Sequence, residues 1–188
     1  MCIRDRESDE FWQIIEQASK QVGFPRLDDC DAETYLDALY DKIVLLTPRE
    51  IVSMEMHNQN IWFAYINTDK IWAAHQIVTD NQWLEFRASL GEFLMGFGRE
   101  KFHRFVCEPD LLLESLTLDD IREGIYRSHS VGVRIERAWK TVTGLDDFVR
   151  LECDVHIPIH PEGIEDRLAE LCPKLHQAAT YEKAQNNG

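Results

Sequence analysis

Hydrophobic residues recur every three or four positions along most of the chain, and short polar stretches separate one such run from the next. This spacing places the hydrophobic side chains on one face of an α-helix, which then packs against a core. A leucine-rich loop is expected to begin at Pro109. We expect helices at 8–22, 31–43, 47–65, 71–78, 79–97, 99–107, 117–125, 131–142 and 164–171. The sequence therefore predicts an all-α fold, in a single multi-helix domain of about eight to ten helices.

Several of these runs begin with residues that stabilise the first turn of a helix. The stretch 47–50 reads Thr-Pro-Arg-Glu, with a capping threonine, a proline in the first helical position and a glutamate that reaches back to the cap. The stretch 79–82, Thr-Asp-Asn-Gln, has the same design with a glutamine in the last position. Thr117 is expected to cap a later helix. Gly23 and Gly144 stand where helices are expected to end.

The segment 151–161 has a different period, because hydrophobic and polar residues alternate in it. Alternation is typical of an extended strand, but the prolines in the segment remove backbone donors that a central strand needs. We therefore expect an extended C-terminal arm that lies over the helices, or at most an edge strand. The chain then divides into a helical body at 8–150, the arm with a C-terminal helix at 151–181, and a polar, disordered tail at 182–188.

We interpret the first six residues as an artefact of DNA sequencing rather than as part of the natural protein. Residues 1–6 read Met-Cys-Ile-Arg-Asp-Arg, which matches a translation of the mosaic-end adapter of transposon-made sequencing libraries. A scar of this kind indicates a metagenomic assembly and carries no information about the fold. We expect residues 1–7 to be a disordered start.

The charge balance limits the partners that the protein can bind. Acidic residues outnumber lysine and arginine by 34 to 20, which gives a formal net charge of −14 at pH 7. A surface of this sign repels nucleic-acid phosphates and anionic lipids, so we expect neither nucleic acid nor a membrane as a partner. A basic protein is a suitable partner. The same net charge is also explained by solubility alone, without any partner.

The apolar runs and the cysteines indicate the location of the protein. No apolar run approaches the ~20 residues of a membrane-spanning helix, and no signal peptide is recognisable. The five cysteines lack the paired spacing of a disulfide framework. We therefore expect a soluble protein of a bacterial cytoplasm.

Short motifs of aromatic, glycine and charged residues mark the starts, cores and ends of the expected helices. They are Phe11-Trp12-x-x-Ile15, Trp72-Ala73-Ala74, Trp83-x-x-Phe86-Arg87, Gly98-Arg99-Glu100-x-Phe102, Pro109-Asp110 and the helix end from Ala138 to Thr143-Gly144. In these motifs, over roughly residues 8–150, the chain resembles the bacterial domain-of-unknown-function family 4240. It departs from the family at 78–81, where members carry a glycine-rich turn. The resemblance implies an all-α fold and supplies no activity.

Cys153, His156 and His160, with Cys172 further along, have the ligand types of a zinc site. In an extended arm, however, the cysteine points to the opposite side from the two histidines, and the histidines lie about 13 Å apart at about 3.3 Å per residue. A turn at Pro158 would bring them together. The alternation favours solvated histidines on a partly buried arm over a metal site, and no cofactor is expected.

His75, Arg87, Arg99 and Glu100 are polar residues within runs that are rich in aromatic side chains. Such residues either form the polar part of a ligand pocket or serve as hydrogen-bonded and ion-paired members of the core. The stretch 96–101 also resembles a glycine loop before a helix, which can bind phosphate through backbone N–H groups. Because the same glycines simply end one helix and begin the next, we favour structural roles.

The chain contains no sequence pattern of a hydrolase nucleophile, a zinc protease or a phosphate-binding loop. We therefore favour a non-catalytic protein-binding domain, of the immunity or accessory type, over an enzyme. The alternative is a small-ligand-binding protein or enzyme with a pocket around His75, Arg87 and Arg99.

Overall fold

The computed structural model describes residues 3–24, 32–66, 68–80, 87–127, 131–146, 148 and 163–186. Every regular element in these residues is a helix, which confirms the predicted all-α fold. The described α-helices run from α1 to α10 and agree with the predicted number. The arm predicted at 151–161 lies outside the described residues.

The bounds of the elements are as follows. The first part of the chain forms α1 (Ile3–Val22), α2 (Ala32–Ile43), α3 (Pro48–Ile61), the π-helix η1 (Trp62–Ile66), α4 (Asp69–Thr79), α5 (Arg87–Met95) and α6 (Arg99–Cys107). The second part forms the 3-10 helix η3 (Pro109–Glu114), α7 (Leu118–Arg127), α8 (Val131–Thr143), the 3-10 helix η4 (Glu165–Arg167), α9 (Leu168–Leu171) and α10 (Pro173–Asn186).

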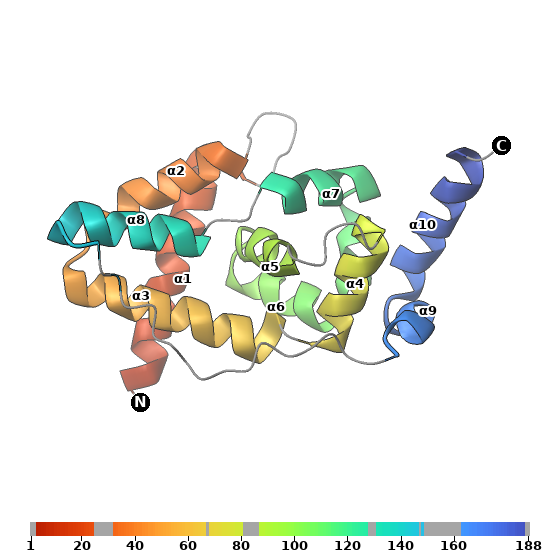
Figure 1. Cartoon of the computed structure of the whole chain (residues 1–188), viewed down its shortest axis with the longest axis horizontal. Coiled ribbons are helices and arrows are strands. Elements are labelled where there is room, and N and C mark those ends of the chain that lie inside the picture. Colours follow the sequence, from red (N-terminus) through yellow and green to blue (C-terminus); the bar gives the residue numbers. More distant parts are fainter. Residues whose placement is uncertain are drawn as a thin grey trace.

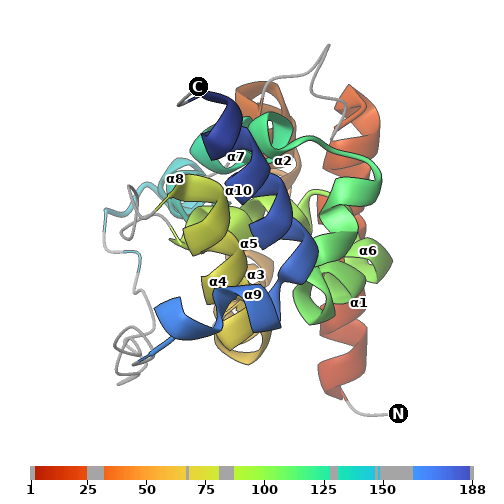
Figure 2. The same cartoon turned by 90° about the vertical axis from the view of Figure 1, so that its right-hand side faces the viewer.

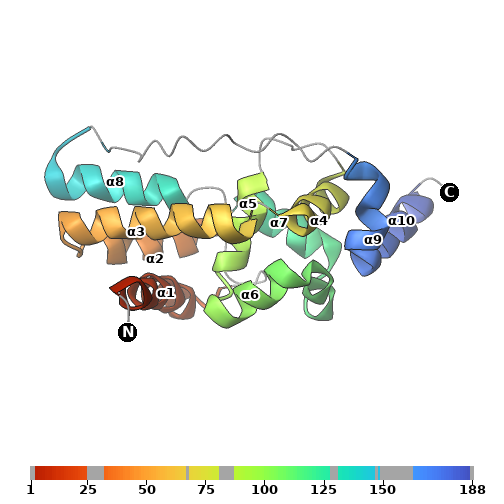
Figure 3. The ribbon, with the colours of Figure 1, turned by 90° about the horizontal axis from the view of Figure 1, so that it is seen from below.

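The helices form two groups along the long axis of the molecule (Figure 1). At one end lie α1, α2, α3 and α8, at the other end lie α4, α7, α9 and α10, and α5 and α6 lie between them. In the first group, α8 packs on one side of α2 and α3, and α1 packs on the other side (Figure 3). Viewed from the second end, α10 runs across the front of the molecule and contacts α4 (Figure 2).

Helix α4 is the most enclosed element in the described part of the chain. All of its residues from Ile71 to Thr79 are buried, including the polar side chains of His75 and Gln76. It contacts α5, α6, α7, η3, α9 and α10. Because an apolar helix gains stability only where its surface is removed from water, the elements around α4 have to cover it on every side.

The structure confirms four of the helix boundaries that the sequence predicts, at Thr47, Thr117, Gly23 and Gly144. Thr47 and Glu50 form a capping box, in which the Thr47 N–H donates to the Glu50 carboxylate at 2.7 Å and the Glu50 N–H donates to the Thr47 hydroxyl at 3.4 Å. Thr117 and Asp120 form the same pair of bonds at the start of α7. Gly23 and Gly144 follow α1 and α8 with φ of 74° and 72°, the left-handed backbone that ends a helix.

Both ends of the chain are more helical than the sequence predicts. α1 begins at Ile3, before the predicted start at Ser8, because no proline or glycine interrupts residues 3–7. α10 continues to Asn186, through most of the tail predicted at 182–188. Glu182 and Lys183 of this segment pair with charged side chains of α7 and of the end of α4, and these contacts hold the last turns.

Two interior boundaries also differ from the prediction. Thr79 does not begin a new helix, because it belongs to α4 and its hydroxyl donates to the His75 carbonyl at 2.8 Å. Asp80 ends α4 instead, with a left-handed φ of 52° that aspartate tolerates better than most residues. The leucine-rich stretch from Pro109 is the helix η3 and not a loop, with Leu112 buried in the core.

Asp110 attaches the C-terminal helix to the body. Its carboxylate is buried and accepts hydrogen bonds from the backbone N–H groups of Lys174 and Leu175, at 3.0 and 2.9 Å. These N–H groups belong to the first turn of α10, where the helix itself offers no acceptor. Pro173 has no N–H, and Cys172 is a poor capping residue, so an aspartate of η3 caps α10 from a distant part of the sequence.

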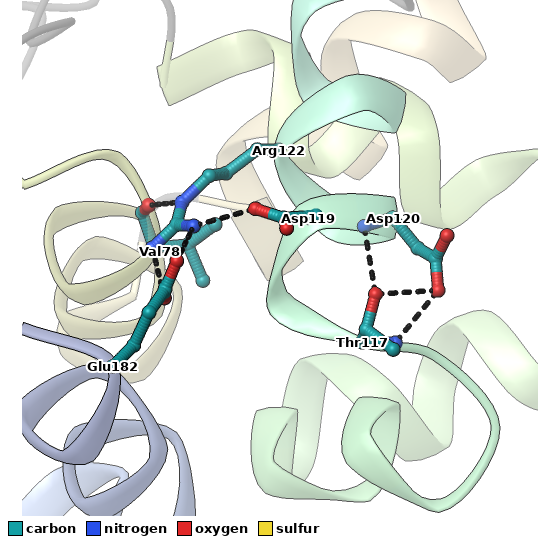
Figure 4. A network of polar contacts seen from close by, with 6 residues as sticks. All are labelled: Val78, Thr117, Asp119, Asp120, Arg122 and Glu182. Carbon is teal, nitrogen blue, oxygen red and sulfur yellow. Dashed lines mark hydrogen bonds and ion pairs between the residues drawn. The ribbon is translucent and has the colours of Figure 1, made fainter. Parts of the chain in front are cut away.

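Arg122 of α7 joins three helices at the same end of the molecule (Figure 4). Its guanidinium donates to both carboxylate oxygens of Glu182 in α10, at 2.8 and 2.9 Å, and to Asp119 at 2.8 Å. Its Nε donates to the carbonyl of Val78 in α4 at 2.8 Å. A bidentate ion pair of this geometry is stronger than an ordinary surface pair, because both N–H···O bonds are aligned. Glu182 therefore positions α10 over the end of α4.

We predict that Asp110→Ala lowers the free energy of unfolding by about 2 kcal/mol, because it leaves two N–H groups of α10 without an acceptor in a buried place. Urea unfolding measures the change. The matched control is Asp41→Ala, at an exposed position of α2. Equal stability of the two variants would contradict the capping role of Asp110.

We also predict that the attachment of α10 weakens in acid. The hydrogen bond from Arg122 lowers the pKa of Glu182 below its ordinary value of 4.5. A lowered folded-state pKa means that the ion pair stabilises α10 fully above pH 4.5 and loses this contribution as the pH falls through the folded-state pKa. The opening free energy of α10, from hydrogen exchange at several pH values, should show this loss in the wild type and a weaker pH dependence in Glu182→Gln. An identical pH dependence in both proteins would count against the pair.

Candidate functional site

The ligand-site residues predicted from the sequence lie in different surroundings. His75 is 1% exposed in the middle of α4. Arg99 and Glu100 are exposed and form the first turn of α6. Arg87 begins α5, and its side chain lies outside the part that the structure describes. A pocket that includes Arg87 stays a prediction.

Two carboxylates of α1 already occupy the start of α6. The Arg99 guanidinium pairs with Asp9, and the Arg99 backbone N–H donates to Glu16 Oε1 at 2.9 Å. Gly98, with φ of 84°, turns the chain so close to α1 that an added Cβ would stand 3.1 Å from the same Glu16 oxygen. The first N–H groups of a helix can bind phosphate. At the start of α6, the carboxylate of Glu16 takes the place of such an anion. This arrangement favours a structural role for Arg99.

The predicted metal site falls mainly on residues that the structure does not describe. Cys153, His156 and His160 all lie outside the described residues. Cys172 is fully buried, and its thiol donates to the Lys70 carbonyl at 3.6 Å. Burial and, after it, the nearby Asp110 raise the pKa of this thiol to about 12, which disfavours the thiolate that zinc requires. Within the described ranges, no group of three or more His, Cys, Asp and Glu side chains is arranged to hold a metal.

A groove of about 610 Å³ lies between α1 and the start of α3. Four apolar side chains line it, of which Phe11 and Met54 are buried and Ile14 and Leu46 are partly buried. The polar side chains around them are Glu10, Gln13, Gln17, Thr47, Arg49, Glu50, Ser53 and His57. The groove thus combines a small apolar base with a rim of polar groups, which is the arrangement found in protein–protein interfaces.

The helical period explains how the two walls arise. Glu10, Gln13 and Gln17 follow one face of α1, next to the face that buries Phe11 and Ile15. On α3, the residues at 49, 50, 53 and 57 form a similar polar face beside the buried Met54. Each face alone has the composition of an ordinary solvated helix surface. The groove exists only because the two faces meet, which is why the sequence does not single it out.

The groove carries carboxylates on both walls. Glu10 is exposed on α1, and Glu50 lies on α3. The hydroxyl and the backbone N–H of Thr47 donate to Glu50 and lower its pKa, so that this carboxylate stays ionised to a lower pH than an ordinary glutamate does. Arg49 is the cation among the lining residues, on the same wall as Glu50. The ring of His57 lies 6.2 Å from the ring of Phe11 and closes the base.

The described helices include none that is both long enough and apolar enough to cross a lipid bilayer.

Comparison with known proteins identifies one family. A family model described as "Protein of unknown function (DUF4240)" matches residues 7–133. No curated protein and no solved structure matches the chain. The matched residues contain the whole groove, together with Asp110 and Arg122. They end near the start of α8, so α9 and α10 lie beyond them.

Proposed function

Because the chain belongs to the DUF4240 family, whose description gives no activity, we propose a function from the structure itself. The domain is a non-catalytic protein-binding module of the immunity or accessory type, and it binds a basic partner protein at the groove between α1 and α3. The observation that supports this proposal is the groove, an apolar base with carboxylates on two opposing walls.

The charge of the whole chain supports the same conclusion. With a net charge of −14, the protein attracts basic partners over several Å and repels acidic ones. Steering by charge raises the association rate, and the apolar base then provides contacts that do not depend on charge. A basic protein surface with a few apolar side chains satisfies both requirements.

The alternative function, a ligand pocket around His75, Arg87 and Arg99, has less support. His75 belongs to the most enclosed helix of the described part, and Arg99 is bound to α1 through both its side chain and its backbone. Groups that already have strong partners contribute little to binding a ligand, because the existing bonds must first be broken.

The cysteines support a reducing location such as the cytoplasm. Cys107 and Cys172, which both lie in the described part of the chain, are free thiols. Free thiols persist where disulfides are kept reduced.

Selection of random 16-residue peptides displayed on phage, with the immobilised protein as bait, tests this proposal. We predict enrichment of peptides that contain lysine or arginine together with apolar residues, and weaker binding of these peptides in 0.5 M salt, which shortens the Debye length to about 4 Å. Gln17→Arg adds a cation to the wall of the groove and should weaken binding of the enriched peptides several-fold.

The matched control is Gln177→Arg, which makes the same change at an exposed position of α10 and should bind the peptides like the wild type. The proposal fails if no peptide is enriched over an empty support. It also fails if the enriched peptides bind Gln17→Arg and the wild type equally well.

A further inference from the structure

Arginine side chains of this protein repeatedly bind between two acidic side chains. Arg122 binds Asp119 and Glu182. The nearly buried Arg134 of α8 contacts two residues of α2, namely Glu33 and, at 3.4 Å, Asp37. In both cases the guanidinium joins separate helices, because its planar fork offers several donors to carboxylates at once.

Two carboxylates from different helices also line the groove between α1 and α3. Glu10 belongs to α1 and Glu50 to α3, and both line the same space. The same lining includes apolar side chains, among them Ile14 and Met54, which offer a surface for the methylene groups of a long side chain. The cavity, at about 610 Å³, is larger than one side chain and leaves room for the neighbouring residues of a partner.

We infer that the groove receives an arginine side chain of the partner protein as its central anchor. The guanidinium lies between Glu10 and the Oε1 oxygen of Glu50, because both bonds from Thr47 go to Oε2, and its methylene groups lie on the apolar base. Arginine suits this place better than lysine, because it is more weakly hydrated and can bind two carboxylates with separate N–H groups. This inference rests on the proposed function and specifies the chemistry of the residue that the groove recognises.

Arg49 of the protein itself acts against such an anchor. It is exposed on the wall that carries Glu50, and its positive charge repels an incoming guanidinium. Its removal therefore has the opposite effect from removal of the carboxylates. This difference in sign separates recognition in the groove from a general attraction between an acidic protein and a basic peptide.

The test is a titration of the ¹⁵N-labelled full chain with the peptide acetyl-Arg₆-amide, followed by NMR. We expect the shift changes to concentrate on residues 10–17 and 47–57. The double variant Glu10→Gln/Glu50→Gln should weaken binding about fivefold, as expected for the loss of two partly exposed ion pairs. Glutamine at position 50 still completes the capping box, so the fold of α3 is preserved. Arg49→Gln should strengthen binding about twofold.

The control is the double variant Glu108→Gln/Glu114→Gln, which changes the net charge equally at exposed positions outside the groove. The inference is overturned if this control weakens binding as much as the groove variant does, or if the shift changes map elsewhere. A hexalysine peptide that binds as tightly as hexa-arginine would overturn the preference for arginine. These outcomes are independent of the phage selection, so failure of the arginine anchor and failure of protein binding can be told apart.

Discussion

The burial of α4 from Ile71 to Thr79 is the constraint on which the rest of the structure depends. A helix whose residues are buried from Ile71 to Thr79 is stable in water only if other elements enclose it. The helices α5 to α7 cover part of its surface, and α9 and α10 cover another part. The last two helices lie beyond residues 7–133 that match the family, yet they complete this enclosure.

The attachment of α10 is largely polar. Leu175 and Ala179 are its buried apolar residues, which is a small area for a helix of 14 residues. The cap from Asp110 and the ion pair between Arg122 and Glu182 therefore carry a large share of its attachment. Polar attachment makes the position of α10 specific, because each hydrogen bond forms only when α10 lies at one position along its neighbours. It also makes that end of the molecule sensitive to pH and salt.

The sequence predicts the local features of this protein well and the contacts between distant segments poorly. Thr47 and Thr117 cap their helices as predicted, because a capping box is encoded within four residues. Thr79 has an equally good signature but belongs to α4, because tertiary packing continues that helix by one residue. Other features bring together residues that are far apart along the chain, namely the bond of Asp110 to α10 and the groove between α1 and α3. No local sequence pattern predicts them.

The groove gives the protein a place where charge and apolar surface act together. Of the predicted site residues, His75 is buried in α4 and Arg99 is bound to carboxylates of α1. The proposed function therefore resides in the space between two helices rather than in a sequence motif. The most direct measurement is hydrogen exchange of the protein alone and in complex with a protein that carries one of the selected peptide sequences. Slower exchange at residues 10–17 and 47–57 in the complex is the predicted result. Slower exchange confined to α9 and α10, with the groove unchanged, would contradict it.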